Sequence, residues 1–558
     1  MINGAEAVVR GLIHQGVRVI YGYPGAANMA IYEALRRSRE IEHVLTRSEQ
    51  GAAHAASGYA RVSGEPGVCL TTSGPGATNL VTGLATAYMD SVPLVAITGQ
   101  VATEMVGTDS FQEVDITGIT KPVTKHNYLV NRVEDIPRIL AEAFHIAGTG
   151  RPGPVLIDIP KDIAAQNCAA KIPEVVDLPG YKPNYKGHPA QIRTACKLLN
   201  EAERPLIYAG GGIIHSGAVA ELLKIAELLE APVAVTLMGK GAFPEDHPLF
   251  LGMLGVHGAP AANKALLASD VILCIGARLD DRVTGRTDKF ATQAKMIHID
   301  IDPAEISKNI RVQVPIVGDA AGVMRDMLLR LQPAKRKDWL AMVAGWLPLQ
   351  EQAYAAKADE LNAQTVLTKL NSFTKGQAII TTDVGQHQMW AAQFCKVNRP
   401  QAFISSGGLG TMGYGLPAAL GAQMAAPNDL VICVTGDGSL QMSMNEFATI
   451  KALGLPIKVL LFNNGVLGMV RQHQAVFFKE KYFSVDLVGN PDFKKIAEAY
   501  DMAYYLIAKI DQVDLVLQEA LANGRATLVD CAIPKEQMVY PMVRPGSSLD
   551  DVIIAMKK

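Results

Sequence analysis

Two polar motifs in the last third of the chain have the residue types that a magnesium and phosphate site needs. Asp437 lies in Gly436-Asp437-Gly438-Ser439, directly after a predicted buried strand, and Asn464 follows the next strand, 458–462. Because parallel strands end at one edge of a sheet, we expect Asp437 and Asn464 to lie side by side. A carboxylate and an amide oxygen suit Mg²⁺ together with substrate phosphates, and the two glycines let the backbone approach a phosphate. A pair of ordinary polar turns is the alternative.

Glu49 is the second candidate for chemistry, because it begins a predicted helix that is made mostly of small residues. Glycine and alanine occupy positions 51–53 and 55–56. Since small residues allow close packing, we expect the Glu49 carboxylate to be buried against a neighbour. Burial favours the protonated form of a carboxyl group and suits it to proton transfer near neutral pH. The alternative is a solvated glutamate that the helix dipole favours.

A glycine-rich turn in the middle of the chain is similar to a dinucleotide-binding turn. A predicted strand, 205–209, leads into Gly210-Gly211-Gly212 and then into a predicted helix that extends to Leu229. The turn departs from G-x-G-x-x-G because His215 occupies the third glycine position, so an ordinary strand–helix connection remains open. Asp300 follows a later predicted strand, where a carboxylate could hold ribose hydroxyl groups.

The elements that must position these residues are those of an α/β protein. Short runs rich in valine and isoleucine alternate with alanine-rich helical stretches, which is typical of doubly wound parallel sheets covered by helices on both faces. Polar stretches that contain proline interrupt the pattern and predict three modules, at 1–170, 190–335 and 365–533, with a C-terminal tail at 534–558.

The first and third modules have the same succession of turns and strands. Asp383 follows Gly22 by 361 positions, and Pro456 follows Pro93 by 363 positions, each at the corresponding point of its module. A nearly constant offset indicates two homologous α/β modules on either side of a different one. The alternative is that two unrelated α/β modules share glycine turns.

Composition favours small molecules as partners and a cytoplasmic location. The 558 residues include 52 Lys+Arg and 54 Asp+Glu, so the formal net charge is −2, and no long basic run predicts binding to nucleic acid or to a membrane surface. The apolar runs are about one strand long, and we expect neither a membrane span nor an export signal. Seven cysteines without a CxxC pair argue against disulfides and zinc sites and favour a reducing cytoplasm.

Taken together, the motifs resemble those of the acetohydroxyacid synthase (acetolactate synthase) family, whose catalytic subunits use thiamine diphosphate (ThDP). The similarity includes the GDGS…NN pair and runs nearly from end to end. The further matching segments are 22–25, 49–52, 72–80, 96–101, 124–126, 150–155, 158–162, 252–255, 280–285, 406–413 and 467–472.

The resemblance implies a fold and an activity. The first module would bind the pyrimidine ring of ThDP, the third would bind its diphosphate with Mg²⁺, and the Rossmann-like middle module would bind FAD without redox turnover. The enzyme would decarboxylate pyruvate and transfer the hydroxyethyl unit to a second 2-ketoacid. The products would be 2-acetolactate or 2-aceto-2-hydroxybutyrate, which belong to branched-chain amino-acid biosynthesis.

The resemblance also assigns residues. Near the reacting centre it implies Glu49, Gln112, Phe111 and Lys161. For ThDP it implies Gly25, Gln386, His387, Gly410, Met412, Gly436, Gly438 and Ser439. For Mg²⁺ it implies Asp437, Asn464 and Val466. For FAD it implies Arg151, His257, Arg278, Asp300 and Asp319.

The implied assembly is a homodimer or homotetramer, because the family places the cofactor between subunits, with Glu49 and Asp437 coming from different chains. A small regulatory subunit is a further partner that the sequence leaves open. Two alternatives also stay open. The chain could be another ThDP enzyme, either an FAD-reducing 2-ketoacid oxidase or a simple decarboxylase. It could also be a silent regulatory subunit, against which the presence of Glu49, Asp437 and Asn464 together argues.

Four positions depart from the family pattern. Most relatives have Trp where this chain has His473, and many have Pro, Gly and Pro where it has Ala102, Ala26 and Arg544. The tryptophan forms one wall for the side chain of the second substrate. The preference between pyruvate and 2-ketobutyrate as acceptor is therefore left open.

Overall fold

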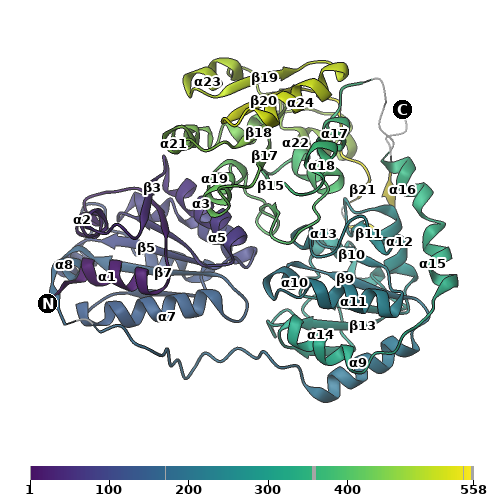
Figure 1. The fold of residues 1–558 in the computed structure, drawn as a ribbon, viewed down its shortest axis with the longest axis horizontal. Helices are drawn as coiled ribbons and strands as arrows, with labels where there is room; N and C mark the ends of the chain where they lie inside the picture. The colour runs from purple at the N-terminus through teal and green to yellow at the C-terminus, as the bar shows by residue number, and fades with distance from the viewer. Residues whose placement is uncertain (1, 170, 355–359, 545, 555–558) are drawn as a thin grey trace.

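Three parallel sheets, each of six strands, organise the chain. The structure is a computed structural model that describes residues 2–169, 171–354, 360–544 and 546–554. In Figure 1 the first sheet lies at the left in purple and blue, the middle one at the lower right in teal, and the third at the top in green and yellow. The predicted α/β class with three parallel-sheet domains is confirmed.

The first sheet has the strand order β3-β2-β4-β5-β7-β6, and each strand pair is parallel. Its strands are β2 (Val19–Gly22), β3 (Glu42–Leu45), β4 (Gly67–Thr71), β5 (Leu94–Gln100), β6 (His126–Leu129) and β7 (Pro154–Pro160). Its main helices are α1 (Gly4–His14), α2 (Met29–Arg37), α3 (Glu49–Ser63), α5 (Val81–Met89), α7 (Ile136–Gly148) and α8 (Lys161–Ala165). Strands β5 and β7 are buried along their whole length, as continuous apolar runs of a sheet covered on both faces should be.

The third sheet repeats this plan, with the order β16-β15-β17-β18-β20-β19 and parallel pairing throughout. Its strands are β15 (Ile379–Thr382), β16 (Phe403–Ile404), β17 (Val431–Gly436), β18 (Lys458–Asn463), β19 (Ala503–Ile507) and β20 (Thr527–Ala532). Its main helices are α17 (Ala363–Thr374), α18 (Gln386–Phe394), α19 (Gly415–Ala425), α20 (Asp437–Leu440), α21 (Phe447–Leu453), α22 (Gly468–Phe477), α23 (Phe493–Ala499) and α24 (Val513–Ala522). Strand by strand, the order is that of the first sheet, which confirms the predicted homology.

The middle sheet has a different order, β11-β10-β9-β12-β13-β14. Its strands are β9 (Pro205–Ala209), β10 (Val233–Val235), β11 (Phe250–Met253), β12 (Val271–Ile275), β13 (Lys295–Asp300) and β14 (Val314–Val317). Numbered along the chain this is the 3-2-1-4-5-6 order of dinucleotide-binding folds, whose ligand crevice lies where the order reverses, between β9 and β12.

The helix after the middle glycine turn differs from the prediction. We expected one helix to extend to Leu229, but the chain forms α10 (Gly211–His215) and α11 (Val219–Leu229). The break lies at Gly217, whose φ of 65° lies in the left-handed region that ends a right-handed helix.

The first and third modules share one hydrophobic core, which includes Ala52 and Ala56 of α3 together with Leu416 and Ala419 of α19. Glycines allow these two helices to approach closely. A Cβ atom on Gly421 of α19 would lie 1.8 Å from the backbone oxygen of Ala55. The two homologous sheets are therefore joined within one chain through α3 and α19.

Three segments outside the sheets connect the modules. Residues 171–188 run without helix or strand to α9 (Pro189–Glu201), as Figure 1 shows along the lower edge of the molecule. The helices α15 (Lys337–Ala344) and α16 (Leu347–Ala353) follow the middle sheet. The tail pairs β21 (Met542–Val543) with β22 (Val552–Ile553) and packs on the middle module.

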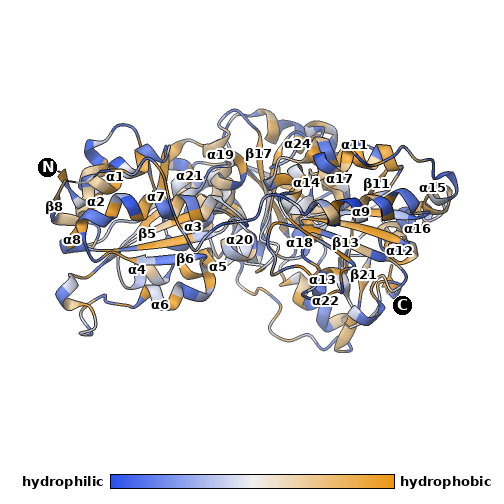
Figure 2. Cartoon of the chain, turned by 90° about the horizontal axis from the view of Figure 1, so that it is seen from below, coloured by the Kyte–Doolittle hydropathy of each residue, from blue (hydrophilic) through white to orange (hydrophobic). Residues whose placement is uncertain are grey.

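Apolar residues follow the strands and polar residues follow the outer helix faces. Figure 2 shows β5 and β13 in orange between helices that carry blue residues. Among the described residues no helix is both long and apolar enough to cross a membrane.

Candidate functional site

Asp437 lies at the carboxyl end of β17, where it begins α20. Its side chain is buried, and its Oδ2 accepts hydrogen bonds from the Gly465 backbone N–H at 2.9 Å and from Asn490 Nδ2 at 2.7 Å. Burial raises the pKa of the Asp437 carboxyl above its usual value, and the two hydrogen bonds oppose that shift. A bound cation would favour the ionised form and repay the cost of burying the charge.

Asn464 is brought beside Asp437, as predicted, because β17 and β18 are neighbours in the sheet. The Val466 N–H donates to Asn464 Oδ1 at 3.2 Å, so Val466 lies in the same turn. No cluster of three or more His, Cys, Asp or Glu side chains that could hold a metal occurs in the described part of the chain. A metal at this edge would therefore share one carboxylate with amide and backbone oxygens, a donor set that fits Mg²⁺.

His387 and Gly436 form a tight contact next to Asp437. A Cβ atom on Gly436 would lie 2.7 Å from His387 Nδ1, so only glycine fits there. Burial lowers the pKa of His387 to about 3, which keeps the imidazole neutral. Its Nε2 is buried and has no hydrogen-bond partner among the described residues. A buried polar atom without a partner points to a missing group, and a phosphate oxygen or its water would satisfy it.

Gln386 and Ser439 belong to the same cluster. The Gln386 side-chain amide donates to Gln472 Oε1 at 3.0 Å and to the Gln537 backbone oxygen at 2.9 Å, which fixes the first turn of α18. The Ser439 hydroxyl donates to the Val384 backbone oxygen at 2.9 Å. These bonds hold the turns after β15 and β17 together.

Met412 and Gly410 lie in the loop between β16 and α19. Gly410 adopts a φ of 72°, and a Cβ atom on Gly438 would lie 4.0 Å from Met412 Cε, so Met412 lies beside the GDGS turn. Sequence reasoning missed Asp383, which holds this loop. Its buried carboxylate accepts from the N–H groups of Gly413 at 2.8 Å and Gly415 at 3.2 Å, and burial raises its pKa to about 6.

Asp383 had a signal in the sequence, because it is an acidic residue directly after a buried strand. Asn490, which contacts Asp437, had none, since 53 residues separate the two.

Glu49 begins α3 at the carboxyl edge of the first sheet, and the Ser48 side chain caps the helix. Its Oε2 accepts a hydrogen bond from Asn79 Nδ2 at 2.9 Å. The expected burial is wrong for the single chain: Glu49 is only half-buried, because the alanines behind it pack against α19 and leave the first turn at the surface.

The other predicted residues of the first module gather at the same edge. Gly25 follows β2 and packs on Thr72. Gln112, with a φ of 61°, lies against Gly74, in the turn whose Gly76 lies near Glu49. Phe111 is 87% exposed, and the exposed Lys161 begins α8 directly after β7. In the described chain no hydrogen bond or ion pair joins Glu49 to Asp437, so the predicted residues form two groups on two modules.

A cavity of about 1040 Å³ lies where the three modules meet. The five residues predicted to bind FAD all line it, and so do Gly410, Met412 and His473. The five residues predicted to bind FAD are Arg151, His257, Arg278, Asp300 and Asp319. The cavity opens at the order reversal of the middle sheet, with Gly212 after β9 and Gly276 after β12 in its wall.

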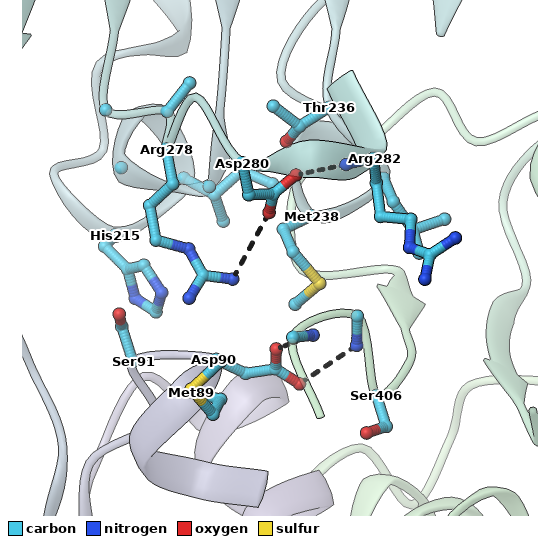
Figure 3. A pocket seen from close by; sticks show the side chains of 18 of the residues that line it. Met89, Asp90, Ser91, His215, Thr236, Met238, Arg278, Asp280, Arg282 and Ser406 are labelled. Atoms are coloured by element: carbon cyan, nitrogen blue, oxygen red, sulfur yellow. Dashed lines mark hydrogen bonds and ion pairs between the residues drawn. The ribbon is translucent and has the colours of Figure 1, made fainter. Parts of the chain in front are cut away.

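Charged groups of both signs face this cavity. In Figure 3, Arg278 reaches toward Asp280, with 4.0 Å between Nη2 and Oδ2, and the Arg282 N–H donates to the Asp280 carboxylate. Arg151 pairs with Asp302 at 3.2 Å, and burial raises the pKa of Asp300 to about 6. A large cavity at a Rossmann switch point, with a strand-end carboxylate and nearby arginines, has the features that an FAD site needs.

The middle glycine turn is tight for a packing reason. A Cβ atom on Gly212 would lie 2.6 Å from Gly276 Cα, so these glycines let two strand-end turns touch. His215, at the third glycine position, lines the cavity (Figure 3).

Three family models match the chain in order. They are the thiamine pyrophosphate enzyme N-terminal TPP binding domain over residues 2–119, the central domain over 192–327, and the C-terminal TPP binding domain over 383–531.

Curated proteins match over almost the whole chain. A probable acetolactate synthase large subunit of Methanocaldococcus jannaschii is 49% identical over 99% of this chain and 95% of its own length. An acetolactate synthase of Mycobacterium leprae is 49% identical over 99% of the chain and 90% of its length. The acetolactate synthase isozyme 3 large subunit of Escherichia coli is 46% identical over 99% of this chain and 98% of its own length. With three matching domains and relatives of this identity, the chain belongs to the acetolactate synthase family of thiamine pyrophosphate enzymes.

Proposed function

We propose that this chain condenses two 2-ketoacids with ThDP, Mg²⁺ and FAD bound. It decarboxylates pyruvate and transfers the hydroxyethyl unit to pyruvate or 2-ketobutyrate, as in branched-chain amino-acid biosynthesis. The observation that carries the proposal is the third-module cluster: a buried Asp437 beside Asn464, with a buried His387 Nε2 that has no hydrogen-bond partner among the described residues. The family relationship supports the same activity.

The third module would hold the diphosphate end of ThDP. Asp437, Asn464 and the Val466 carbonyl would bind Mg²⁺, while Gly436, Gly438, Ser439, Gln386 and His387 would surround the phosphates. Gly410 and Met412 would support the rings from the loop after β16. When bound, ThDP supplies an electron sink for the carbon–carbon bond that breaks on decarboxylation. The protein residues bind it, orient it and exclude water.

The first module would handle the proton and the substrates. Glu49 would exchange a proton with the pyrimidine end of the cofactor at its carboxylate oxygens. Gln112, Phe111 and Lys161 would surround the 2-ketoacids, and Gly25 would leave room at the edge of the sheet.

Two copies of the chain would complete each site, in a homodimer or homotetramer. Glu49 is half-buried and does not line the cavity that contains Met412, although both belong to the proposed site. A second copy would bring its first module to this edge and cover the exposed Phe111. A small regulatory subunit is a further proposed partner, because relatives are named large subunits.

FAD would occupy the large cavity and stay out of redox turnover. Arg151 and Arg278 would face its phosphates, Asp300 and Asp319 its hydroxyl groups, and His257 its ring end. The proposed domains are those of the sequence, at 1–170, 190–335 and 365–533, with the tail at 534–558. A cytoplasmic location is supported by seven free, buried cysteines.

The decisive experiment mixes the apo-enzyme with ThDP, Mg²⁺, FAD and pyruvate and identifies the products. We expect one 2-acetolactate and one CO₂ for every two pyruvates, with no peroxide. Free acetaldehyde would make the chain a decarboxylase, and peroxide would make it an oxidase. Binding of the cofactors without turnover would make it a silent subunit.

A further inference from the structure

One loop forms part of both proposed cofactor sites. Residues 405–412, which we call the shared loop, follow β16 in the third module. Gly407 and Gly408 line the large cavity, and so does Met412, which also lies beside the GDGS turn at Gly438. A displacement of this loop would therefore change the dinucleotide cavity and the ThDP site together.

Asp90 of the first module holds the shared loop in place. Its side chain is fully buried, at the end of α5. Its Oδ1 accepts from the Gly408 N–H at 2.7 Å, and its Oδ2 accepts from the Gly407 N–H at 3.2 Å and from Arg61 Nη2 at 2.8 Å. Figure 3 shows this carboxylate facing the two backbone nitrogens across the floor of the cavity.

Arg61 extends the same contact. Its Nη1 donates to the Ser405 backbone oxygen at 2.7 Å. The Arg61–Asp90 ion pair therefore bonds to the loop at Ser405 and at Gly407 and Gly408. A Cβ atom on Gly408 would lie 2.9 Å from Asp90 Oδ1 and 3.0 Å from Arg278 Nη2. Asp90 thus contacts the turn, and an arginine of the proposed FAD site lies beside it.

A neutral hydrogen bond provides a second anchor. The hydroxyl groups of Thr86, also on α5, and Thr411, next to Met412, share a hydrogen bond of 2.7 Å. Buried ion pairs are weak sources of stability, because desolvation offsets their attraction, but they do select one geometry where every polar group is satisfied. The Asp90 carboxylate receives three donors and is satisfied, whereas Arg61 Nε has no hydrogen-bond partner among the described residues.

We propose that Asp90 is a positioning residue whose carboxylate keeps the shared loop in the conformation that both cofactor sites require. Each site is then formed whether or not the other is occupied. The inference rests on the proposed binding of FAD and ThDP. Without the anchor, each cofactor has to order the loop itself, and the first to bind spares the second that cost.

The test measures equilibrium binding of ThDP with Mg²⁺, in the absence and presence of saturating FAD, and of FAD alone. In the unmodified protein we expect FAD to change the ThDP dissociation constant by less than about 3-fold. In Asp90→Asn we expect each cofactor alone to bind about 10-fold more weakly, and bound FAD to recover ThDP affinity by about 5–10-fold, within the usual range of coupling. In Thr86→Val we expect each cofactor alone to bind about 3-fold more weakly, and bound FAD to recover the ThDP affinity by about 3-fold.

The matched control is Glu142→Gln, which removes another buried carboxylate of the first module, paired with Arg138 at 2.8 Å on α7 and outside the shared loop. It should lower the melting temperature without coupling the two cofactors. Coupling in this control would overturn the role of Asp90, because loss of any buried carboxylate would then suffice.

The remaining outcomes are separable. Failure of the unmodified protein to bind FAD or ThDP would refute the proposed function. Normal binding of both, with the same affinities in Asp90→Asn, would refute the positioning role alone. If Asp90→Asn does not fold, Thr86→Val decides, and unchanged affinities there would refute the inference.

Discussion

The first and third modules have the same strand order but differ in what they bury at the carboxyl edge of the sheet. The third module buries Asp437 and Asp383 there, and glycine turns pack around them. The first module leaves Glu49 half-buried and Phe111 87% exposed at the corresponding edge. One fold therefore provides one edge that is closed within the chain and one that is open.

The difference separates what topology determines from what residues determine. Parallel pairing places turns at a common edge in both modules. Whether the edge is closed depends on side chains, since an exposed aromatic ring and a half-buried carboxylate on the same edge leave contact surface for another molecule. We infer that the third edge binds its part of the cofactor alone and that the first needs a second chain.

The largest expected effect comes from the open edge. Glu49→Gln keeps the shape of the side chain but cannot exchange a proton, so the rate of acetolactate formation should fall by about 10²–10⁴-fold. The control is Glu42→Gln, an exposed glutamate on β3 of the same module, which should leave the rate unchanged. Ordinary turnover in a folded Glu49→Gln protein would remove Glu49 from the mechanism.

The closed edge is tested by Asp437→Ala. ThDP and Mg²⁺ should both bind more weakly, by more than about 100-fold, because loss of even an indirect partner of a metal commonly costs 10–100-fold. Raising both cofactors together should recover part of the activity. Titration of ThDP at several Mg²⁺ concentrations measures this, with Asp514→Ala on the exposed face of the same module as control. Unchanged ThDP affinity would place the metal elsewhere.

The sequence could predict the elements better than the contacts between them. Strands β9 and β18 were predicted at 205–209 and 458–462 and are found at Pro205–Ala209 and Lys458–Asn463, because buried parallel strands are continuous apolar runs. The contacts of Asp90 with the shared loop left no local pattern, since packing of two modules across more than 300 residues creates them. For the single chain the burial of Glu49 was predicted wrongly, because small residues indicate a close neighbour but not which part of the helix it covers.

The contact between the two homologous modules can be broken by one methyl group. In Gly421→Ala the new Cβ would lie 1.8 Å from the Ala55 oxygen of α3, so the helices must separate. We expect the free energy of unfolding to fall by about 1–3 kcal/mol or more. Gly148→Ala is the matched control, because its nearest neighbour atom is 3.9 Å away. Chemical denaturation should show that the free energy of unfolding of Gly148→Ala is unchanged or slightly higher. Equal decreases of this free energy in the two variants would contradict the tight contact.

Asp158 is a buried carboxyl of the first module, and its pH dependence sharpens the comparison. Asp158, at β7, accepts from Thr98 Oγ1 at 2.7 Å and Gln100 Nε2 at 2.9 Å, yet burial raises its pKa to about 7. Since the unfolded group ionises near pH 4, the folded state holds the extra proton between about pH 4 and 7, and stability falls as pH rises through that window. The unfolding free energy of the wild type relative to Asp158→Asn should drop by about 1.4 kcal/mol per pH unit there. A pH-independent difference would show that Asp158 stays ionised.

The smallest expected effect concerns the acceptor. His473, on α22 of the third module, lines the large cavity together with His257 and Arg282 of the middle module. These three residues come from the third and middle modules and not from the edge of the first module. An imidazole offers less apolar surface than an indole to the extra methyl group of 2-ketobutyrate. One such group is worth about 1–3 kcal/mol in a fitted pocket, and part of that difference should be absent here. In a competition assay, His473→Trp should raise the preference for 2-ketobutyrate over pyruvate by about 3–10-fold, toward the lower part of that range. The thermal stability of the variant serves as its control, since residue 473 is partly exposed and either ring fits there. An unchanged preference in a folded His473→Trp protein would mean that position 473 does not contact the acceptor and that the third module contributes to the cofactor alone.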